Sequence, residues 1–165
     1  MGYDNTVGSR PKSDVAYIAG FLDGDGSLML QIKKRADSRI GIRFMATICF
    51  YQDSRHDKPL HWIRSVLGIG YVSHRNDGMT ELRINGFESV QNVLQELLPH
   101  IRFKQKQARA LLRACGLLKT APMKKLTAQK RRRIVGYMLV IQNENYATKR
   151  KRSKNELLAL LGLTP

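Results

Sequence analysis

One stretch determines how this chain folds, and it is YIAGFLDGDGS, residues 17–27. Ser13 or Asp14 can cap a helix that runs through the apolar residues Val15–Leu22. The segment Asp23–Gly26 has two glycines in four residues, which favours a turn at the helix C-terminus. The sequence therefore predicts a short apolar helix that ends on two carboxylates.

Small residues lie on one face of this predicted helix, which would let a second helix backbone approach closely. Ala16 and Gly20 are four positions apart and share a face, with Ala19 beside them. If two copies of the chain pack along this face, their Asp-Gly-Asp-Gly ends lie side by side, and each copy contributes one carboxylate to a shared centre. Mg²⁺ prefers such hard oxygen ligands and can take further ones from a phosphate. The residues expected to contact the second copy are Ala16, Ala19, Gly20 and Asp23.

The residues beyond this helix alternate between apolar and polar side chains, a pattern that predicts strands. Residues 27–34 and 39–51 each have one apolar face, and Asn76-Asp77-Gly78 is a strong hairpin signal between residues 70–75 and 79–85. Helical spacing predicts further helices at residues 60–67, 90–97, 104–118, 127–142 and 154–162. The predicted core includes Leu28, Ile32, Ile42, Phe44, Ile48 and Trp62.

This order of elements indicates an α+β fold. A four-stranded antiparallel sheet would be covered by helices on its apolar face, which leaves a polar, basic face for a ligand. We expect a flexible arm at residues 1–13, a core at 14–120 and a basic helical extension at 121–165. The densest charge run of the extension is Lys149–Lys154, which fits either a phosphate contact or an ordinary solvated surface.

Charge indicates the class of ligand. The 165 residues contain 29 Lys and Arg against 13 Asp and Glu, a formal net charge of +16. Such a domain is typical of a protein that binds a polyanion, and nucleic acid is favoured over an anionic membrane or a merely solubilising surface. Charge alone does not distinguish binding from cleavage, because phosphate contacts carry no sequence information.

Location and redox state follow from what the sequence lacks. No stretch approaches the roughly 18 to 20 apolar residues of a membrane-spanning helix, and residues 1–12 lack the apolar segment of a secretory signal. We therefore expect an intracellular protein without membrane association or an organic cofactor. Cys49 and Cys115 are predicted to be buried thiols, with a disulfide or a zinc site as the alternative.

The stretch IAGFLDGDG, residues 18–26, resembles the signature of the LAGLIDADG homing endonucleases. Its departures are Phe21 at a large apolar position and Gly24 at a small one. The similarity continues through GIGYV at Gly68–Val72 and FKQKQ at Phe103–Gln107, and spans roughly residues 14–118. The resemblance implies the single-motif branch, whose members cut double-stranded DNA as homodimers with Mg²⁺ or another hard divalent ion such as Mn²⁺. Because no second signature follows, we expect a homodimer and a near-palindromic target.

The resemblance also assigns roles to individual residues. It implies that Asp25 is the metal-binding catalytic acid and that the Gly24 carbonyl is a backbone metal ligand. Gln52 matches a position that orders water near the scissile phosphate, and Lys104 one that stabilises its developing charge. His56 stands where the family often has arginine, so whether His56 or the adjacent Arg55 assists is open.

The polar face of the predicted sheet supplies candidates for base recognition in the major groove. These candidates are Gln31, Lys33, Arg35, Arg43, Thr47, Ser73, Arg75, Glu81 and Arg83. Met29, Met45 and Cys49 lie on the same face and could contact thymine methyl groups.

Three other functions fit part of the pattern. An intron RNA-splicing maturase of the same fold is compatible with every residue above. A DNA-binding regulator that has lost cleavage is disfavoured by Asp25 and Lys104. A basic ribosome-associated protein would explain the charge but not the Asp-Gly-Asp-Gly helix end.

Overall fold

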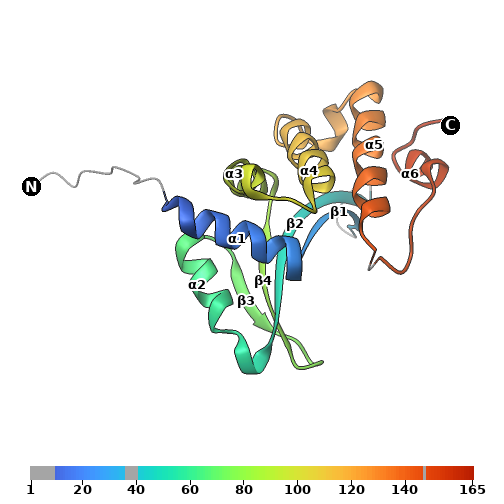
Figure 1. Ribbon diagram of the computed structural model, residues 1–165. Coiled ribbons are helices and arrows are strands. Elements are labelled where there is room, and N and C mark those ends of the chain that lie inside the picture. Colours follow the sequence, from blue (N-terminus) through green and yellow to red (C-terminus); the bar gives the residue numbers. More distant parts are fainter. Residues whose placement is uncertain (1–9, 36–40, 147) are drawn as a thin grey trace, which may run out of the picture.

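The computed structural model describes residues 10–35, 41–146 and 148–165, and Figure 1 shows how their elements are arranged. In chain order the elements are α1 (Lys12–Asp25), β1 (Gly26–Lys34), β2 (Ile42–Asp53), η1 (Ser54–His56), α2 (Lys58–Leu67), β3 (Tyr71–His74), β4 (Met79–Asn85), α3 (Phe87–Leu97), η2 (Leu98–His100), α4 (Gln105–Leu118), η3 (Met123–Lys125), α5 (Ala128–Glu144) and α6 (Lys154–Leu160). The α+β class predicted from the sequence is confirmed.

The four strands form one antiparallel sheet in the order β1-β2-β4-β3. The register pairs Gly26 with Phe50 at one end of β1 and Lys34 with Ile42 at the other. The predicted hairpin joins β3 to β4, and Gly78 adopts φ 79°, a left-handed conformation that glycine tolerates. Because successive side chains alternate between faces, this register decides which residues look toward the helices and which do not.

The junction of α1 and β1 has no connecting loop. The sequence predicted a turn over Asp23–Gly26, but α1 continues to Asp25 and β1 begins at Gly26. Gly26 has an extended backbone, so its φ angle does not require glycine. A Cβ there would lie 2.6 Å from Leu22 Cδ1 and 2.8 Å from the Leu22 carbonyl oxygen. Glycine at position 26 therefore gives the strand room to pass the last turn of the helix.

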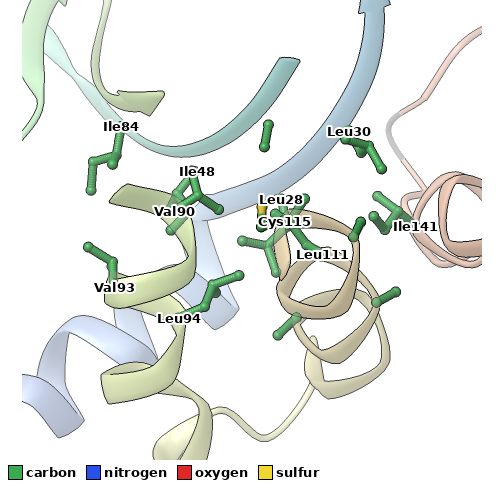
Figure 2. Close-up of a cluster of buried hydrophobic side chains, with 14 of the residues drawn as sticks. Leu28, Leu30, Ile48, Ile84, Val90, Val93, Leu94, Leu111, Cys115 and Ile141 are labelled. Carbon is green, nitrogen blue, oxygen red and sulfur yellow. The ribbon is translucent and has the colours of Figure 1, made fainter. Parts of the chain in front are cut away.

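The hydrophobic core lies between the sheet and the helices α1, α3, α4 and α5 (Figure 1). Figure 2 shows Leu28 and Ile48 of the sheet facing Val90, Leu111 and other helix residues. Leu28, Ile48 and Leu111 are fully buried, and each such side chain contributes about 1.5–3 kcal/mol through removal from water. Phe44 is buried as predicted, whereas Ile32 and Ile42, near the end where Lys34 pairs with Ile42, are only partly buried.

Both cysteines are free and buried, as the sequence predicted. Burial raises the pKa of the Cys49 thiol to about 11 and that of Cys115 to about 12. Neither thiol therefore ionises near neutral pH, which fits packing rather than chemical reactivity.

Two details differ from the sequence predictions, and one prediction cannot be compared with the structure because it falls outside the described residues. Helix α1 begins at Lys12 with Pro11 as its N-cap, so Lys12 and Ser13 do not belong to an arm. Residues 1–9 of the predicted arm lie outside the described residues, whereas Arg10 donates a hydrogen bond to the Val66 carbonyl at 2.8 Å. The predicted turn between the first two strands and the start of the second strand at Arg39 fall largely on residues 36–40, also outside the described residues. Trp62 is 38% exposed rather than part of the core, and its ring stacks edge-on against Tyr17 at 5.5 Å.

Candidate functional site

The C-terminal end of α1 is fixed to the start of α4 by Asp23. One carboxylate oxygen, Oδ2, accepts hydrogen bonds from the backbone N–H groups of Arg102 at 2.6 Å and Phe103 at 3.2 Å. The other, Oδ1, accepts one from the Lys104 N–H at 3.0 Å. Asp23 therefore satisfies donors just before α4, and its side chain is 8% exposed. This arrangement holds the Asp-Gly-Asp-Gly segment rigidly against the loop that carries Lys104.

Asp25 is exposed at the end of α1 and lines a cavity of about 510 Å³. Gly24 and Lys104 line the same cavity, as do Tyr51 of β2 and Arg75 of the hairpin between β3 and β4. The structure thus brings together three of the residues that the resemblance implicated in catalysis or metal binding.

Lys104 is 8% exposed, and its ammonium group donates a hydrogen bond to the Asp23 carbonyl oxygen. Burial lowers the pKa of Lys104, while the nearby Asp23 and Asp25 carboxylates oppose that shift. Lys104 therefore provides a desolvated positive charge close to Asp25, where it could stabilise negative charge on a phosphate.

A metal ion at this end of α1 could take the Asp25 carboxylate and the Gly24 carbonyl as ligands. Among the described residues no group of three or more His, Cys, Asp or Glu side chains could hold a metal by itself. This donor set fits a hard cation such as Mg²⁺ with an incomplete protein cage, which needs oxygens from a substrate and from a second carboxylate.

Gln52 and His56 are not among the residues that line this cavity, although Gln52 directly follows Tyr51, which does line it. Gln52 pairs with Thr80 near the end of β2, and its Oε1 accepts a hydrogen bond from the Asp53 N–H at 2.9 Å. His56 is exposed in η1. The adjacent Arg55 donates to Asp53 from Nε at 3.0 Å and Nη2 at 2.7 Å, and these hydrogen bonds lower the pKa of the Asp53 carboxyl far below its usual value.

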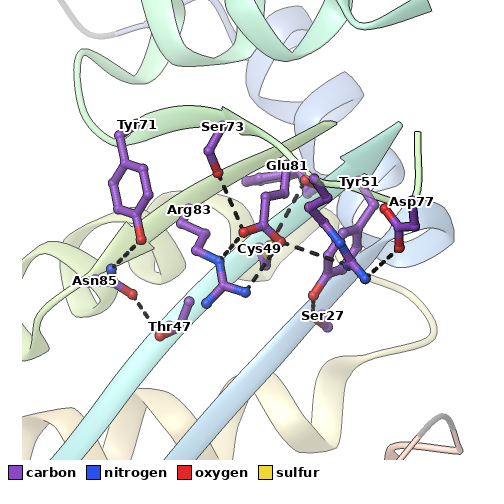
Figure 3. Close-up of polar contacts among 12 residues, drawn as sticks. Ser27, Thr47, Cys49, Tyr51, Tyr71, Ser73, Asp77, Glu81, Arg83 and Asn85 are labelled. Atoms are coloured by element: carbon purple, nitrogen blue, oxygen red, sulfur yellow. Dashed lines mark hydrogen bonds and ion pairs between the residues drawn. The ribbon is translucent and has the colours of Figure 1, made fainter. Parts of the chain in front are cut away.

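The polar face of the sheet carries several hydrogen-bonded groups of side chains, which Figure 3 shows. The Thr47 hydroxyl donates to Asn85 Oδ1 at 2.7 Å, and Asn85 Nδ2 donates to the Tyr71 hydroxyl at 3.2 Å. A second chain links Ser27 to the Tyr51 hydroxyl at 3.0 Å. The face is therefore pre-ordered by its own hydrogen bonds.

Two of the predicted base-contacting residues are buried in this network. Thr47 is fully buried beneath Asn85, and Glu81 is 7% exposed with its carboxylate engaged by Arg83. Alternation gave the correct face for both, but it could not show that neighbouring side chains cover them. Cys49 is likewise fully buried, so its thiol is not available to a base.

Two further polar residues on this face, Tyr71 and Asn85, were not among the contacts predicted from the sequence. Tyr71 and Asn85 lie on the same face as Ser73 and Arg83 and are both exposed. The same period-two alternation that selected Ser73 and Arg83 could have identified them. Their hydroxyl and amide groups extend the set of potential DNA contacts.

The other predicted contacts lie toward the opposite end of the sheet or on the hairpin. Lys33 pairs directly with Arg43, and Gln31 pairs with Met45. Lys33 and Arg43 are exposed, as is Arg35, which follows β1. Gln31 and Lys33 also line a cavity of about 380 Å³ with residues of the C-terminal extension, namely Gln142, Asn145, Thr148, Arg150 and Arg152 among others.

The outer face of α1 is open to solvent along a stripe of small residues. Ala16, Gly20 and Gly24 are exposed, and a Cβ added at Gly20 or Gly24 would meet no atom within 4 Å. Ala19 is fully buried in the core of its own protomer, and Asp23 is engaged with the loop before α4. Of the four residues predicted at a dimer contact, only Ala16 and Gly20 therefore face outward.

Comparison with known proteins identifies the family. The model of the LAGLIDADG endonuclease family matches residues 18–115. The DNA endonuclease I-CvuI of Chlorella vulgaris is 36% identical over 97 residues, which are 59% of this chain and 60% of that relative. The DNA endonuclease I-CreI of Chlamydomonas reinhardtii is 30% identical over 110 residues, 67% of each chain. This chain belongs to the LAGLIDADG endonuclease family.

The structural similarity extends further along the chain than the sequence similarity. The crystal structure of I-CvuI in complex with its target, in the presence of calcium, superposes with a TM-score of 0.81 and 27% identity. The superposition covers 93% of this chain and 98% of I-CvuI, so it includes most of the C-terminal extension. The sequence match, in contrast, spans 60% of the length of the Chlorella relative.

Proposed function

We propose that this protein is a site-specific DNA endonuclease that hydrolyses phosphodiester bonds as a metal-dependent homodimer. The observation that carries the proposal is the position of Asp25 at the exposed end of α1, in one cavity with the buried Lys104. Family membership supports nuclease chemistry at this position, and the +16 net charge supports a nucleic-acid substrate.

The homodimer is supported by the chemistry of the metal site. At the end of α1 one chain offers the exposed Asp25 carboxylate and the Gly24 carbonyl, which are too few ligands for a divalent ion. Asp77, which lines the same cavity, is already paired with Arg75 at 2.7 Å. The small residues Ala16, Gly20 and Gly24 leave the outer face of α1 free for a close helix contact. Two chains packed along this stripe would place their two Asp25 carboxylates side by side, at the two-fold axis.

In this arrangement the residues of the chain have separate roles. Asp25 and the Gly24 carbonyl would hold Mg²⁺, or Mn²⁺, which acidifies water and offsets charge on the phosphate when bound. Lys104 would stabilise the negative charge that develops on the scissile phosphate. Gln52 would orient the attacking water, and either His56 or Arg55 would assist at the edge of the site.

The DNA would lie along the polar face of the sheet, whose strands enter the major groove. The DNA contacts would include Gln31, Lys33 and Arg43, whose positions on this face support that role. The C-terminal extension, residues 121–165, is attached to the edge strand β1, because Asn145 Nδ2 donates a hydrogen bond to the Leu28 carbonyl at 3.0 Å. Its basic side chains would therefore contact phosphates next to β1. Symmetry implies a near-palindromic target. A site-specific endonuclease of this family would find its target in genomic DNA, which supports an intracellular location.

A cleavage screen tests this proposal. Purified protein is incubated with a plasmid library that carries a randomised insert, with Mg²⁺ or with EDTA, and the linear products are sequenced. We expect linear molecules that share one near-palindromic sequence, formed only with Mg²⁺. Asp25→Asn should abolish cleavage and retain binding to the selected sequence. Cleavage by the Asp25→Asn protein at the wild-type rate would contradict the assigned chemistry.

Binding to the selected DNA duplex, compared with binding to a folded intron RNA, distinguishes the endonuclease from the maturase alternative. A maturase would bind a folded intron RNA more tightly than this duplex and would leave the plasmid library uncut.

A further inference from the structure

The basic side chains on the polar face of the sheet fall into two groups that differ in their surroundings. Lys33 and Arg43 are exposed and directly opposite each other, and among the described residues neither has an acidic partner. Arg75 and Arg83 are instead held by carboxylates, Arg75 by Asp77 at 2.7 Å and Arg83 by Glu81. The second group is formally neutral, so it adds little attraction for a polyanion.

Glu81 is the centre of the second group. It lies on β4 between Tyr51 of β2 and Ser73 of β3 and is almost completely buried. Its Oε1 accepts a hydrogen bond from Arg83 Nε at 2.6 Å, and its Oε2 accepts one from Arg83 Nη2 at 3.2 Å. Oε2 also lies 3.9 Å from Arg75 Nη1. Both carboxylate oxygens are thus occupied within the protein, as Figure 3 shows for Arg83.

This contact determines which donors of Arg83 remain for a ligand. A guanidinium carries five N–H groups, and Glu81 takes one on Nε and one on Nη2. The remaining donors, on Nη1 and Nη2, form the far edge of the guanidinium. Two N–H groups in this arrangement match O6 and N7 of guanine, the pair of acceptors that arginine contacts most often in the major groove.

We propose that Glu81 is a positioning residue for sequence recognition, which holds Arg83 so that the far edge of its guanidinium meets a guanine in each half of the target. The inference rests on the proposed function, because it requires a DNA duplex along this face of the sheet. A guanidinium that is already fixed loses little rotamer freedom on binding. It also cannot turn to accommodate another base, so the pair favours discrimination.

If Glu81 positions Arg83, removing the Glu81 charge should raise the affinity for any DNA duplex and lower the discrimination between sequences. Glu81 places a negative charge toward DNA, which opposes binding to any sequence. Glu81→Gln removes this charge and turns an N–H₂ group toward Arg83, so it should bind random duplex more tightly. Discrimination at the guanine position should fall about tenfold or more, the lower range for losing an oriented bidentate contact.

A binding selection tests both effects. Wild type, Glu81→Gln, Arg83→Gln and the double variant are each used to select from a randomised duplex library in buffer with Ca²⁺. The wild type should select a near-palindromic consensus. Glu81→Gln should lose the preference for guanine at one position per half-site and keep the others. Arg83→Gln should lose the same position, and adding Glu81→Gln to it should change the preference no further.

Asp77→Asn is the matched control. Like Glu81→Gln it removes one negative charge, here the carboxylate that pairs with Arg75, but it leaves the Glu81–Arg83 pair intact. It should raise the affinity for random duplex without changing the guanine position. An unchanged consensus for Glu81→Gln would overturn the positioning role alone. Preferences weakened at every position, together with lower affinity, would mean a merely structural role and would also overturn it. Failure of the wild type to select any sequence would overturn the proposed function as well.

Discussion

Asp23 and Lys104 hold each other in place across the junction of α1 and α4. The Asp23 carboxylate accepts the Lys104 backbone N–H, and the Lys104 ammonium donates to the Asp23 carbonyl oxygen. The two residues are 81 positions apart in the chain. This reciprocal contact fixes Asp25, two residues further on, next to a buried positive charge.

The first prediction concerns Asp23→Asn. Asparagine has one acceptor oxygen and would turn an N–H₂ group toward backbone donors, so at least one of the three N–H groups loses its partner. We expect the free energy of unfolding to fall by about 1–3 kcal/mol and DNA cleavage to slow more than DNA binding weakens. Urea unfolding and single-turnover cleavage measure the two effects. Asp14→Asn, in the first turn of the same helix, is the control and should change each by much less.

The second prediction concerns the pH dependence of Lys104. Because burial lowers its pKa, the ammonium loses its proton at a lower pH than an ordinary lysine. The cleavage rate should therefore fall on the alkaline side below pH 10.5, the usual lysine pKa. Lys104→Arg keeps its charge and should shift this fall to higher pH. Single-turnover rates at saturating DNA across the pH range check this, and identical profiles for the two proteins would rule out the role.

The same shift has a consequence for stability. Between the lowered pKa and the usual value, the unfolded chain binds more protons at Lys104 than the folded protein does. The contribution of this group to the free energy of unfolding therefore rises with pH across that window. Urea titrations at several pH values across this window give the free energy of unfolding. Its slope against pH should differ between wild type and Lys104→Met.

The third prediction concerns the stripe of small residues on α1. Gly20→Leu has space in the isolated protomer, because a Cβ there meets nothing within 4 Å. It should leave the protomer folded and block a close helix contact, so that the protein is monomeric at micromolar concentration and does not cleave DNA. Sedimentation velocity gives the state of assembly.

Gly136→Leu is the matched control for that change. Gly136 is an exposed glycine of α5 with the same open surroundings, so the substitution has a similar effect on helix propensity. It should remain dimeric and active. A dimeric, active Gly20→Leu protein would contradict the shared metal site.

The fourth prediction concerns the basic segment after α5. Replacing the exposed residues Lys149, Arg150 and Lys151 with Gln should weaken binding to all sequences alike and reduce the dependence of log K on log salt. The slope should fall by about 0.9 for each phosphate contact removed. Replacing Arg109 and Arg113 with Gln on the exposed surface of α4 is the control. Equal changes in slope for the two sets would indicate a general charge effect.

The sequence by itself determined the fold class, the Asp-Gly-Asp-Gly end of α1 and the polar face of the sheet. Periodicity is a local property of the chain, and the apolar alternation of Leu28 and Leu30 gave the buried face directly. The Asp-Gly-Asp-Gly segment likewise located Asp25. The buried state of Cys49 and Cys115 also followed from their apolar surroundings.

Only the tertiary structure decided how these residues are used. The partners of Asp23 come from residues 102–104, so no local pattern could show that its carboxylate is already engaged. Glu81 and Arg83 lie two residues apart on β4, so alternation places them on one face, but only the packing of the neighbouring strands buries the Glu81 carboxylate. Ala19 and Gly20 are adjacent and both small, yet one is in the core and the other is open to solvent. Side-chain period sets the direction in which a residue points, whereas long-range packing sets what it meets there.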